Sequence, residues 1–193
     1  KASGLRDPIN RPDPDQTVSE DEAYLVPVTY MNSSADLKDF VGRHGGVVCT
    51  SSNARGVLEW AFARAGEHGA VLFFPDQHLG RNTGLKMGLE EDVMPVWTPG
   101  EGSDQALSGA RIVLWHGYCS VHERFTVPQI EDFRQRHPEG VVVVHPECPR
   151  ATVEAADADG STEHIKQYIE AQPEGAAIAV GTEINMVARM AKE

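Results

Sequence analysis

The sequence predicts an α/β protein made of two three-layer α/β/α units with short parallel sheets. Short apolar or β-branched runs recur along the 193 residues, and most are followed by a polar turn and then by a helical pattern. Continuous apolar strands that alternate with helices are typical of parallel sheets covered on both faces. The strand ends of the two halves also carry similar polar turns, which indicates a weak internal repeat.

Six runs have the length and composition of buried strands, and they cover residues 25–30, 47–49, 70–74, 111–115, 141–145 and 176–181. Between these runs, apolar residues recur at helical spacing. Ile165, Tyr168 and Ile169 fall on one helical face, and so does a longer series from 57 to 65. The order of strands and helices therefore predicts two Rossmann-like units.

The expected domain limits follow changes in composition. Residues 1–23 are rich in Pro and acidic residues and lack apolar periodicity, so we expect a flexible or remodelled N-terminal arm. The first α/β/α domain is expected over 24–117 and the second over 118–193. Residues 84–110 are rich in Gly, Pro, Glu and Asp, which predicts a loop insertion within the first domain.

Polar turns mark strand ends in both halves of the sequence. The turns read "TYMNSS", "CTSSNARG" and "FFPDQHLG" in the first half, and "VVHPECPR", "DGSTEHIK" and "VGTEINM" in the second. Plain helix capping explains any single turn. Open α/β sheets also bind ligands at the carboxyl ends of their strands, and helix N-termini favour phosphate or carboxylate groups. We therefore expect two units facing one cleft that accepts anionic ligands.

Composition excludes several classes of function. A net charge of −12 without a basic stripe argues against a nucleic-acid partner. No apolar run of 18 residues is present, which argues against a membrane span, and the first residues lack the apolar centre of a signal peptide. Three irregularly spaced cysteines do not suggest a disulfide framework and favour a reducing cytoplasm.

Cys119 lies between two histidines in "WHGYCSVHERF". Three interpretations stay open from spacing alone: a packing thiol, a nucleophile paired with His122, or one ligand of a metal site. Cys49 lies inside a predicted strand and Cys148 follows "HPE", so packing is the default for both.

The run "VVVVHPEC" places a histidine and a carboxylate at the end of one predicted strand. His145 and Glu147 are therefore candidates for an acid/base pair. The alternative is that Glu147 only places a negative charge near a helix N-terminus.

Seven motifs together resemble the quinolinate synthase family. They are "VTYMNSS", "VVCTSSNA", "FFPDQHLG", "WHGYCSVHERF", "HPEC", "DGST" and "GTEIN", in the family's order and at roughly its spacing, over residues 25–193. The resemblance implies a cytoplasmic enzyme, classed as a transferase, of NAD biosynthesis. Such an enzyme condenses iminoaspartate with dihydroxyacetone phosphate to quinolinate. L-Aspartate oxidase or aspartate dehydrogenase would supply the iminoaspartate.

The resemblance also implies three related domains around a pseudo-threefold axis, with a [4Fe–4S] cluster at their junction. Three cysteines, one from each repeat, hold that cluster and leave one iron open as a Lewis acid. Cys119 matches the second of these ligands. The first domain and the third cysteine are not in this sequence, so we expect the 193-residue chain to be two of three domains. We expect it to lack the cluster and activity by itself.

Further site residues follow from the same resemblance, which matches them to substrate-binding or catalytic positions. Tyr30 and Asn32 match a substrate-contacting pair, and Ser51 matches a serine that binds the carboxylate or phosphate end. His122 matches a substrate-site histidine.

The second half supplies the remaining matches. His145 and Glu147 match a turn whose glutamate acts in acid/base steps. Ser161 and Thr162 match an anion-binding turn, whereas Glu183 receives no definite role.

Two other classes of function compete with the cluster enzyme. One is a non-catalytic binding module for a sugar phosphate or dicarboxylate, using Ser51, Ser161 and Thr162 without iron. The other is a Cys–His hydrolase or transferase centred on Cys119.

Overall fold

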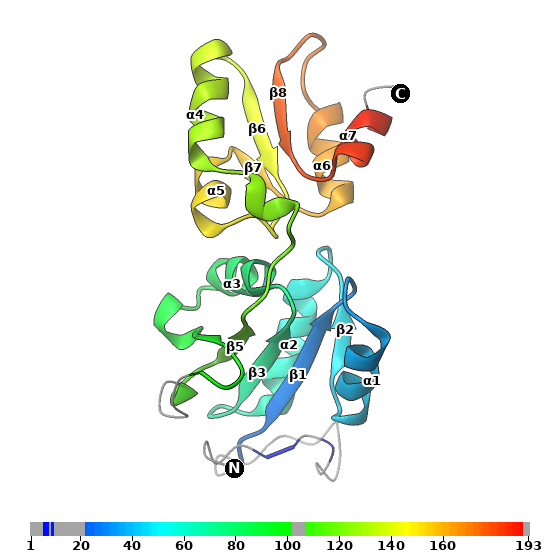
Figure 1. The fold of residues 1–193 in the computed structure, drawn as a ribbon, viewed down its shortest axis with the longest axis vertical. Coiled ribbons are helices and arrows are strands. Elements are labelled where there is room, and N and C mark those ends of the chain that lie inside the picture. The colour runs from blue at the N-terminus through cyan, green and yellow to red at the C-terminus, as the bar shows by residue number, and fades with distance from the viewer. Residues whose placement is uncertain (1–5, 8, 10–21, 102–106, 191–193) are drawn as a thin grey trace. The chain divides into compact units, whose positions relative to one another are not determined.

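The computed structural model describes residues 6–7, 9, 22–101 and 107–190. The chain divides into two compact units between Gly117 and Tyr118. Each unit has its own parallel β-sheet interleaved with helices (Figure 1), which confirms the predicted α/β class. Most of the segment 1–23 lies outside the described residues, although Arg6 forms a parallel bridge with Tyr24.

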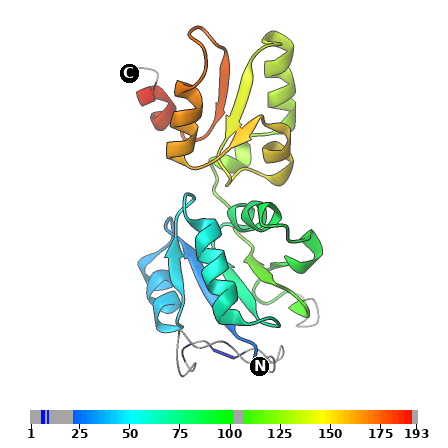
Figure 2. The ribbon, with the colours of Figure 1, turned by 180° about the vertical axis from the view of Figure 1, so that it is seen from behind.

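The sheet of the first unit has the strand order β2-β1-β3-β5-β4, and each neighbouring pair is parallel. Its strands are β1 (Leu25–Tyr30), β2 (Val47–Cys49), β3 (Ala70–Phe74), β4 (Val96–Trp97) and β5 (Ile112–Trp115). Its helices are α1 (Ala35–Arg43), α2 (Ala54–Ala65) and α3 (Gln77–Lys86). Figure 2 shows α2 lying across the face of the sheet that Figure 1 turns away from the viewer.

Helices cover both faces of this sheet because successive strand residues point to opposite sides. Phe73 of β3 faces α3 so closely that a Cβ built on Gly80 would lie 2.8 Å from its ring. The next residue, Phe74, points the other way and meets Phe40 of α1 edge to face, with ring centroids 6.3 Å apart. The first unit therefore has three layers.

The stretch 84–110, expected to be a loop insertion, contains regular structure. The end of α3 is followed by a 3₁₀ turn, Glu91–Val93, and by β4, in which Val96 pairs with Leu114 of β5. Met94 between them is fully buried. Two strand residues are too few to show a period of two, so composition alone could not reveal this edge strand.

The sheet of the second unit has the parallel order β7-β6-β8. Its strands are β6 (Val141–Val144), β7 (Ala158–Asp159) and β8 (Ile178–Gly181). Its helices are α4 (Val127–Arg136), α5 (Arg150–Ala155), α6 (Thr162–Glu170) and α7 (Ile184–Met190). The first three strands of each unit, taken along the chain, lie in the order second, first, third, as an internal repeat requires.

Alternating residues of β6 fill two cores in the second unit. Val142 and Val144 pack with Ile130 of α4, whereas Val143 packs with Ile165 of α6 and Met186 of α7. The three successive buried valines therefore pack against helices on both faces of the sheet, and this packing holds the end of β6 in place.

Several polar turns at the strand ends do cap helices. Ser34, Asp76 and Ser161 each accept a hydrogen bond from a backbone N–H in the first turn of α1, α3 and α6 respectively. Within the described ranges no helix is long and apolar enough to cross a membrane.

Candidate functional site

The carboxyl end of β6 positions two buried polar residues, His145 and Glu147. The backbone N–H of His145 donates to the carbonyl of Gly181 on β8, which continues the sheet ladder past Val144. The N–H of Cys148 donates back to the carbonyl of His145 and closes a tight turn around Pro146. His145 and Glu147 are each 3% exposed, so both side chains of this turn are buried.

A second histidine reaches the same place from a different segment. His122 begins a 3₁₀ turn, His122–Arg124, and is buried. Its ring stacks on the ring of His145, with centroids 4.5 Å apart and planes 15° from parallel. Nε2 of His122 lies 3.2 Å from the hydroxyl of Thr182, the first residue after β8.

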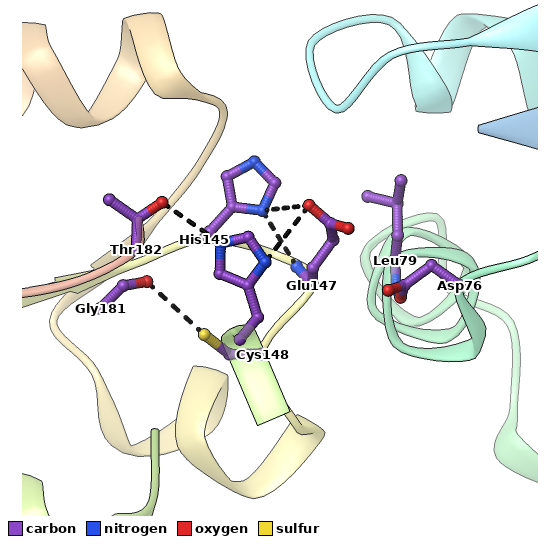
Figure 3. Close-up of polar contacts among 8 residues, drawn as sticks. Asp76, Leu79, His145, Glu147, Cys148, Gly181 and Thr182 are labelled. Carbon is purple, nitrogen blue, oxygen red and sulfur yellow. Dashed lines mark hydrogen bonds and ion pairs between the residues drawn. The ribbon is translucent and has the colours of Figure 1, made fainter. Parts of the chain in front are cut away.

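Both imidazoles converge on one carboxylate oxygen (Figure 3). Oε2 of Glu147 lies 3.1 Å from Nδ1 of His145 and 3.4 Å from Nδ1 of His122. The backbone N–H of Glu147 also donates to Nδ1 of His145, at 3.3 Å. A buried carboxylate between two imidazoles is suited to holding and moving a proton.

Burial controls the charge of His122. The pKa of its imidazole falls from 6.5 to about 4, chiefly because burial disfavours the charged ring. His145 lowers this pKa further, whereas Glu147 raises it. His122 is therefore neutral near pH 7 and can offer a nitrogen lone pair.

The three thiols differ in exposure. Cys119 is partly exposed, and one ligand atom from each of Cys119, His122 and Glu147 lies within 4.8 Å of the others. Cys148 is fully buried beside the carbonyl of Gly181, 3.6 Å away. Cys49 is fully buried in the core of the first unit, and desolvation raises its pKa to about 12. Cys119 is thus the thiol best placed to react or to bind a metal.

The predicted anion turn of the second unit lies at the start of α6. Ser161 is the N-cap, and its hydroxyl accepts a hydrogen bond from the N–H of His164 at 3.4 Å. Thr162 is exposed beside it. Glu183 caps the start of α7 in a similar way, because its carboxylate accepts hydrogen bonds from the backbone N–H groups of Asn185 and Met186. These hydrogen bonds lower the pKa of Glu183, and the bond from the N–H of Asn185 has the largest effect.

The remaining predicted residues belong to the first unit. Tyr30 ends β1 with its side chain in the hydrophobic core, 5% exposed, and Asn32 is exposed two residues later. Ser51 is half-buried in the turn after β2. The side chain of Asn53 closes that turn by accepting from the N–H of Thr50 at 2.7 Å. All three predicted residues follow or end a strand at the carboxyl edge of the sheet.

Thr182 is a functional candidate that motif reasoning did not single out. It is buried, and its hydroxyl is a hydrogen-bonding partner of His122 from a segment sixty residues away. The only signal in the sequence was its place directly after an apolar strand, in "GTEIN".

Fold and site together define the class of protein. It is an α/β protein that brings a thiol, two imidazoles and a carboxylate together at the carboxyl edge of a parallel sheet. Such a group can hold a metal ion or perform acid/base catalysis.

Comparison with known proteins gives the family. Residues 5–193 match the family model described as quinolinate synthetase A protein. The chain is 57% identical over 173 residues to the quinolinate synthase of Corynebacterium glutamicum. It is 51% identical over 178 residues to that of Rhodopirellula baltica and 46% over 172 residues to that of Bacillus subtilis. The chain belongs to the quinolinate synthase family.

The matched region covers most of this chain but under half of each relative. The three alignments include 88–90% of this chain and 43–46% of the relatives. The chain therefore spans a little under half the length of these relatives.

Proposed function

We propose that this chain is part of a quinolinate synthase, which condenses iminoaspartate with dihydroxyacetone phosphate to give quinolinate in NAD biosynthesis. The observation that carries the proposal is the meeting of Cys119, His122, His145 and Glu147 at one sheet edge, in a chain of this family. The family resemblance assigns Cys119 to the metal, His145 and Glu147 to the turn that acts in acid/base steps, and His122 to the substrate site.

Within this proposal, Glu147 is the acid/base residue. Its carboxylate is buried, and Nδ1 of His145 lies 3.1 Å from Oε2, so a proton can pass between two groups already in contact. Neutral His122 contacts substrate without adding a charge. Burial of all three groups excludes water, which strengthens these polar interactions and protects an imine from hydrolysis.

The anionic ends of the substrates would be bound by hydroxyls and amides rather than by cationic side chains. Ser51 and Asn32 in the first unit, and Ser161 and Thr162 in the second, have the required groups at strand ends or at a helix start. Tyr30 completes the proposed set from the end of β1. This mode of binding is compatible with a net charge of −12.

The iron–sulfur cluster of the family would be held only in part by this chain. A cubane cluster needs several thiolates, and of the three cysteines in this sequence only Cys119 is exposed to any extent. Cys119 would be one ligand, and the bound cluster would supply an open iron that acts as a Lewis acid. We infer that the 193-residue chain alone neither keeps a cluster nor turns over.

We extend the proposal to the partners and the compartment of the whole enzyme. The iminoaspartate comes from L-aspartate oxidase or aspartate dehydrogenase, because an imine that hydrolyses readily must be made close to where it is used. The odd number and irregular spacing of the three cysteines favour the reducing cytoplasm.

The acid/base role is tested in the complete protein by Glu147→Gln, with Glu154→Gln as the matched control. Glu154 is an exposed residue of α5 that pairs only with Arg150 among the ion pairs of the described residues. Glu147→Gln should lower kcat for quinolinate formation by roughly 10²-fold or more, the usual scale of general acid–base catalysis. The control should keep full activity. Equal activity in both variants would contradict the acid/base role of Glu147.

The 193-residue chain alone should fail to gain a cluster on anaerobic reconstitution with iron and sulfide. Visible absorption of a cubane cluster at one per chain would contradict that inference.

A further inference from the structure

The end of β8 contacts both histidines of the second unit. The carbonyl of Gly181 accepts a hydrogen bond from the backbone N–H of His145 at 3.0 Å. The hydroxyl of the next residue, Thr182, lies 3.2 Å from Nε2 of His122. Because the two imidazole rings stack on each other, with centroids 4.5 Å apart, the end of this strand holds the stacked pair at two points.

The contact between Thr182 and His122 is isolated from water. Both residues are buried, so water does not compete for the hydrogen bond between the hydroxyl and the ring. The other ring nitrogen of His122, Nδ1, is also buried and has no hydrogen-bond partner among the described residues. Within this part of the chain, the hydroxyl of Thr182 is therefore the only hydrogen-bonding group that fixes the ring.

This arrangement favours one tautomer of the ring. A neutral imidazole carries a single proton, either on Nδ1 or on Nε2. The acceptor facing Nδ1 of His122 is Oε2 of Glu147, which is 3.4 Å away and beyond the usual range of an N–H···O hydrogen bond. A proton on Nδ1 would leave a buried donor unsatisfied, and buried donors without a partner are rarer than buried acceptors without one. A proton on Nε2 can instead be donated to Thr182.

The Nε2–H tautomer leaves the lone pair of Nδ1 free beside the carboxylate of Glu147. A free acceptor at this position can receive a hydrogen bond from a substrate donor. Dihydroxyacetone phosphate has a hydroxyl group and iminoaspartate has an imine N–H, so each proposed substrate offers such a donor. A proton on Nδ1 would turn the same nitrogen into a donor and would repel both groups.

We propose that Thr182 is a positioning residue whose hydroxyl accepts the Nε2 proton of His122 and keeps Nδ1 free to accept a hydrogen bond from substrate. This inference rests on the proposed quinolinate synthase function. Thr182 acts through His122 alone. Serine, which keeps the hydroxyl, can therefore replace it, whereas valine, which has nearly the same shape without the hydroxyl, cannot.

Nuclear magnetic resonance of the 193-residue chain tests the tautomer directly. Long-range ¹H–¹⁵N correlations of the imidazole rings at pH 7 distinguish a protonated from an unprotonated ring nitrogen, and their loss in His122→Gln assigns the signals of His122. The native chain and Thr182→Ser should carry the proton on Nε2. Thr182→Val should show averaged nitrogen shifts, because the ring exchanges between tautomers.

Thr152→Val is the matched control. Thr152 is another buried threonine of the second unit, and its hydroxyl donates to the carbonyl of Phe125 at 2.8 Å. This variant also loses a buried hydroxyl and should keep the native pattern of His122. A proton on Nδ1 in the native chain would overturn the proposal without any variant.

Activity of the complete protein tests the consequence for the reaction. Thr182→Val should lower kcat/KM for quinolinate formation by about 10- to 100-fold, the scale on which a misplaced group acts, and Thr182→Ser should recover most of it. In a His122→Gln background, Thr182→Val should cause no further loss, because the two residues act as one unit. A purely structural role would lower activity in both backgrounds, and that result would overturn the proposal.

The two arms separate this inference from the proposed function. If Glu147→Gln loses activity while Thr182→Val keeps native kcat/KM and the native tautomer, only the role of Thr182 fails. If the complete protein forms no quinolinate, the proposed function fails, and the tautomer measured in the 193-residue chain still decides whether Thr182 orients His122.

Discussion

Acidification should destabilise the second unit of the metal-free chain through His122. In the folded protein the pKa of this imidazole is about 4, whereas an unfolded chain has the ordinary value of 6.5. Between these two values the unfolded chain binds a proton that the native state does not. The free energy of unfolding is therefore at its full value above pH 6.5 and falls as the pH drops toward 4.

The magnitude follows from the shift. Each pKa unit corresponds to about 1.4 kcal/mol, so the shift of His122 amounts to about 3 kcal/mol between pH 7 and pH 4. That is a large part of the stability of a small domain, which is typically about 5–15 kcal/mol.

Urea unfolding measures this effect when it is followed through the backbone amide signals of Val142–Val144, which report on the second unit alone. His122→Gln is the reference, because glutamine keeps a polar side chain that does not titrate. The native chain should lose about 3 kcal/mol more than His122→Gln between pH 7 and pH 4. Parallel pH profiles for the two proteins would refute the claim that burial holds this ring neutral.

Three further predictions concern packing and thiol chemistry. Gly181→Ala places a Cβ about 2.8 Å from Cγ1 of Val144. Thermal unfolding should therefore show that the free energy of unfolding falls by about 1–3 kcal/mol. An unchanged melting temperature would contradict the packing of β8 on β6. Gly56→Ala adds a Cβ within α2 at a point where no other atom lies within 4 Å. Because alanine favours a helix more than glycine does, denaturant titrations should show the first unit stabilised by about 0.5–1 kcal/mol. Destabilisation would show that this face of α2 is not open. A thiol reagent should label Cys119 in the native chain and leave Cys49 unlabelled until unfolding, since burial raises the pKa of Cys49 to about 12; labelling of two thiols in the native state would contradict their burial.

Continuous apolar runs predicted the longer strands well, because strands of a parallel sheet that is covered on both faces are apolar along their whole length. The run "VVVV" was unmistakable, and it is β6. The short edge strands β4 and β7 were missed, since each has two residues and depends on a neighbouring strand for its conformation. Tertiary contacts define such strands, and no local pattern records them.

The candidate site was predictable only in part. Local chemistry and family resemblance identified His145 and Glu147 in one turn and Cys119 with His122 in another. The sequence could not show that His122 stacks on His145, or that Thr182 hydrogen-bonds to His122, because these contacts join residues 23 and 60 positions apart. The prediction that these groups share a cleft with Tyr30, Asn32 and Ser51 stays a prediction.

The central claim is that the sulfur of Cys119 is a metal ligand while the sulfur of Cys148 is a packing atom. Iron and acid-labile sulfide, counted in the complete protein after anaerobic purification, test it most directly. Cys119→Ala should lose iron and sulfide together, whereas Cys148→Ala should keep the native amounts. Native iron content in Cys119→Ala, or loss of iron in a folded Cys148→Ala, would contradict this assignment.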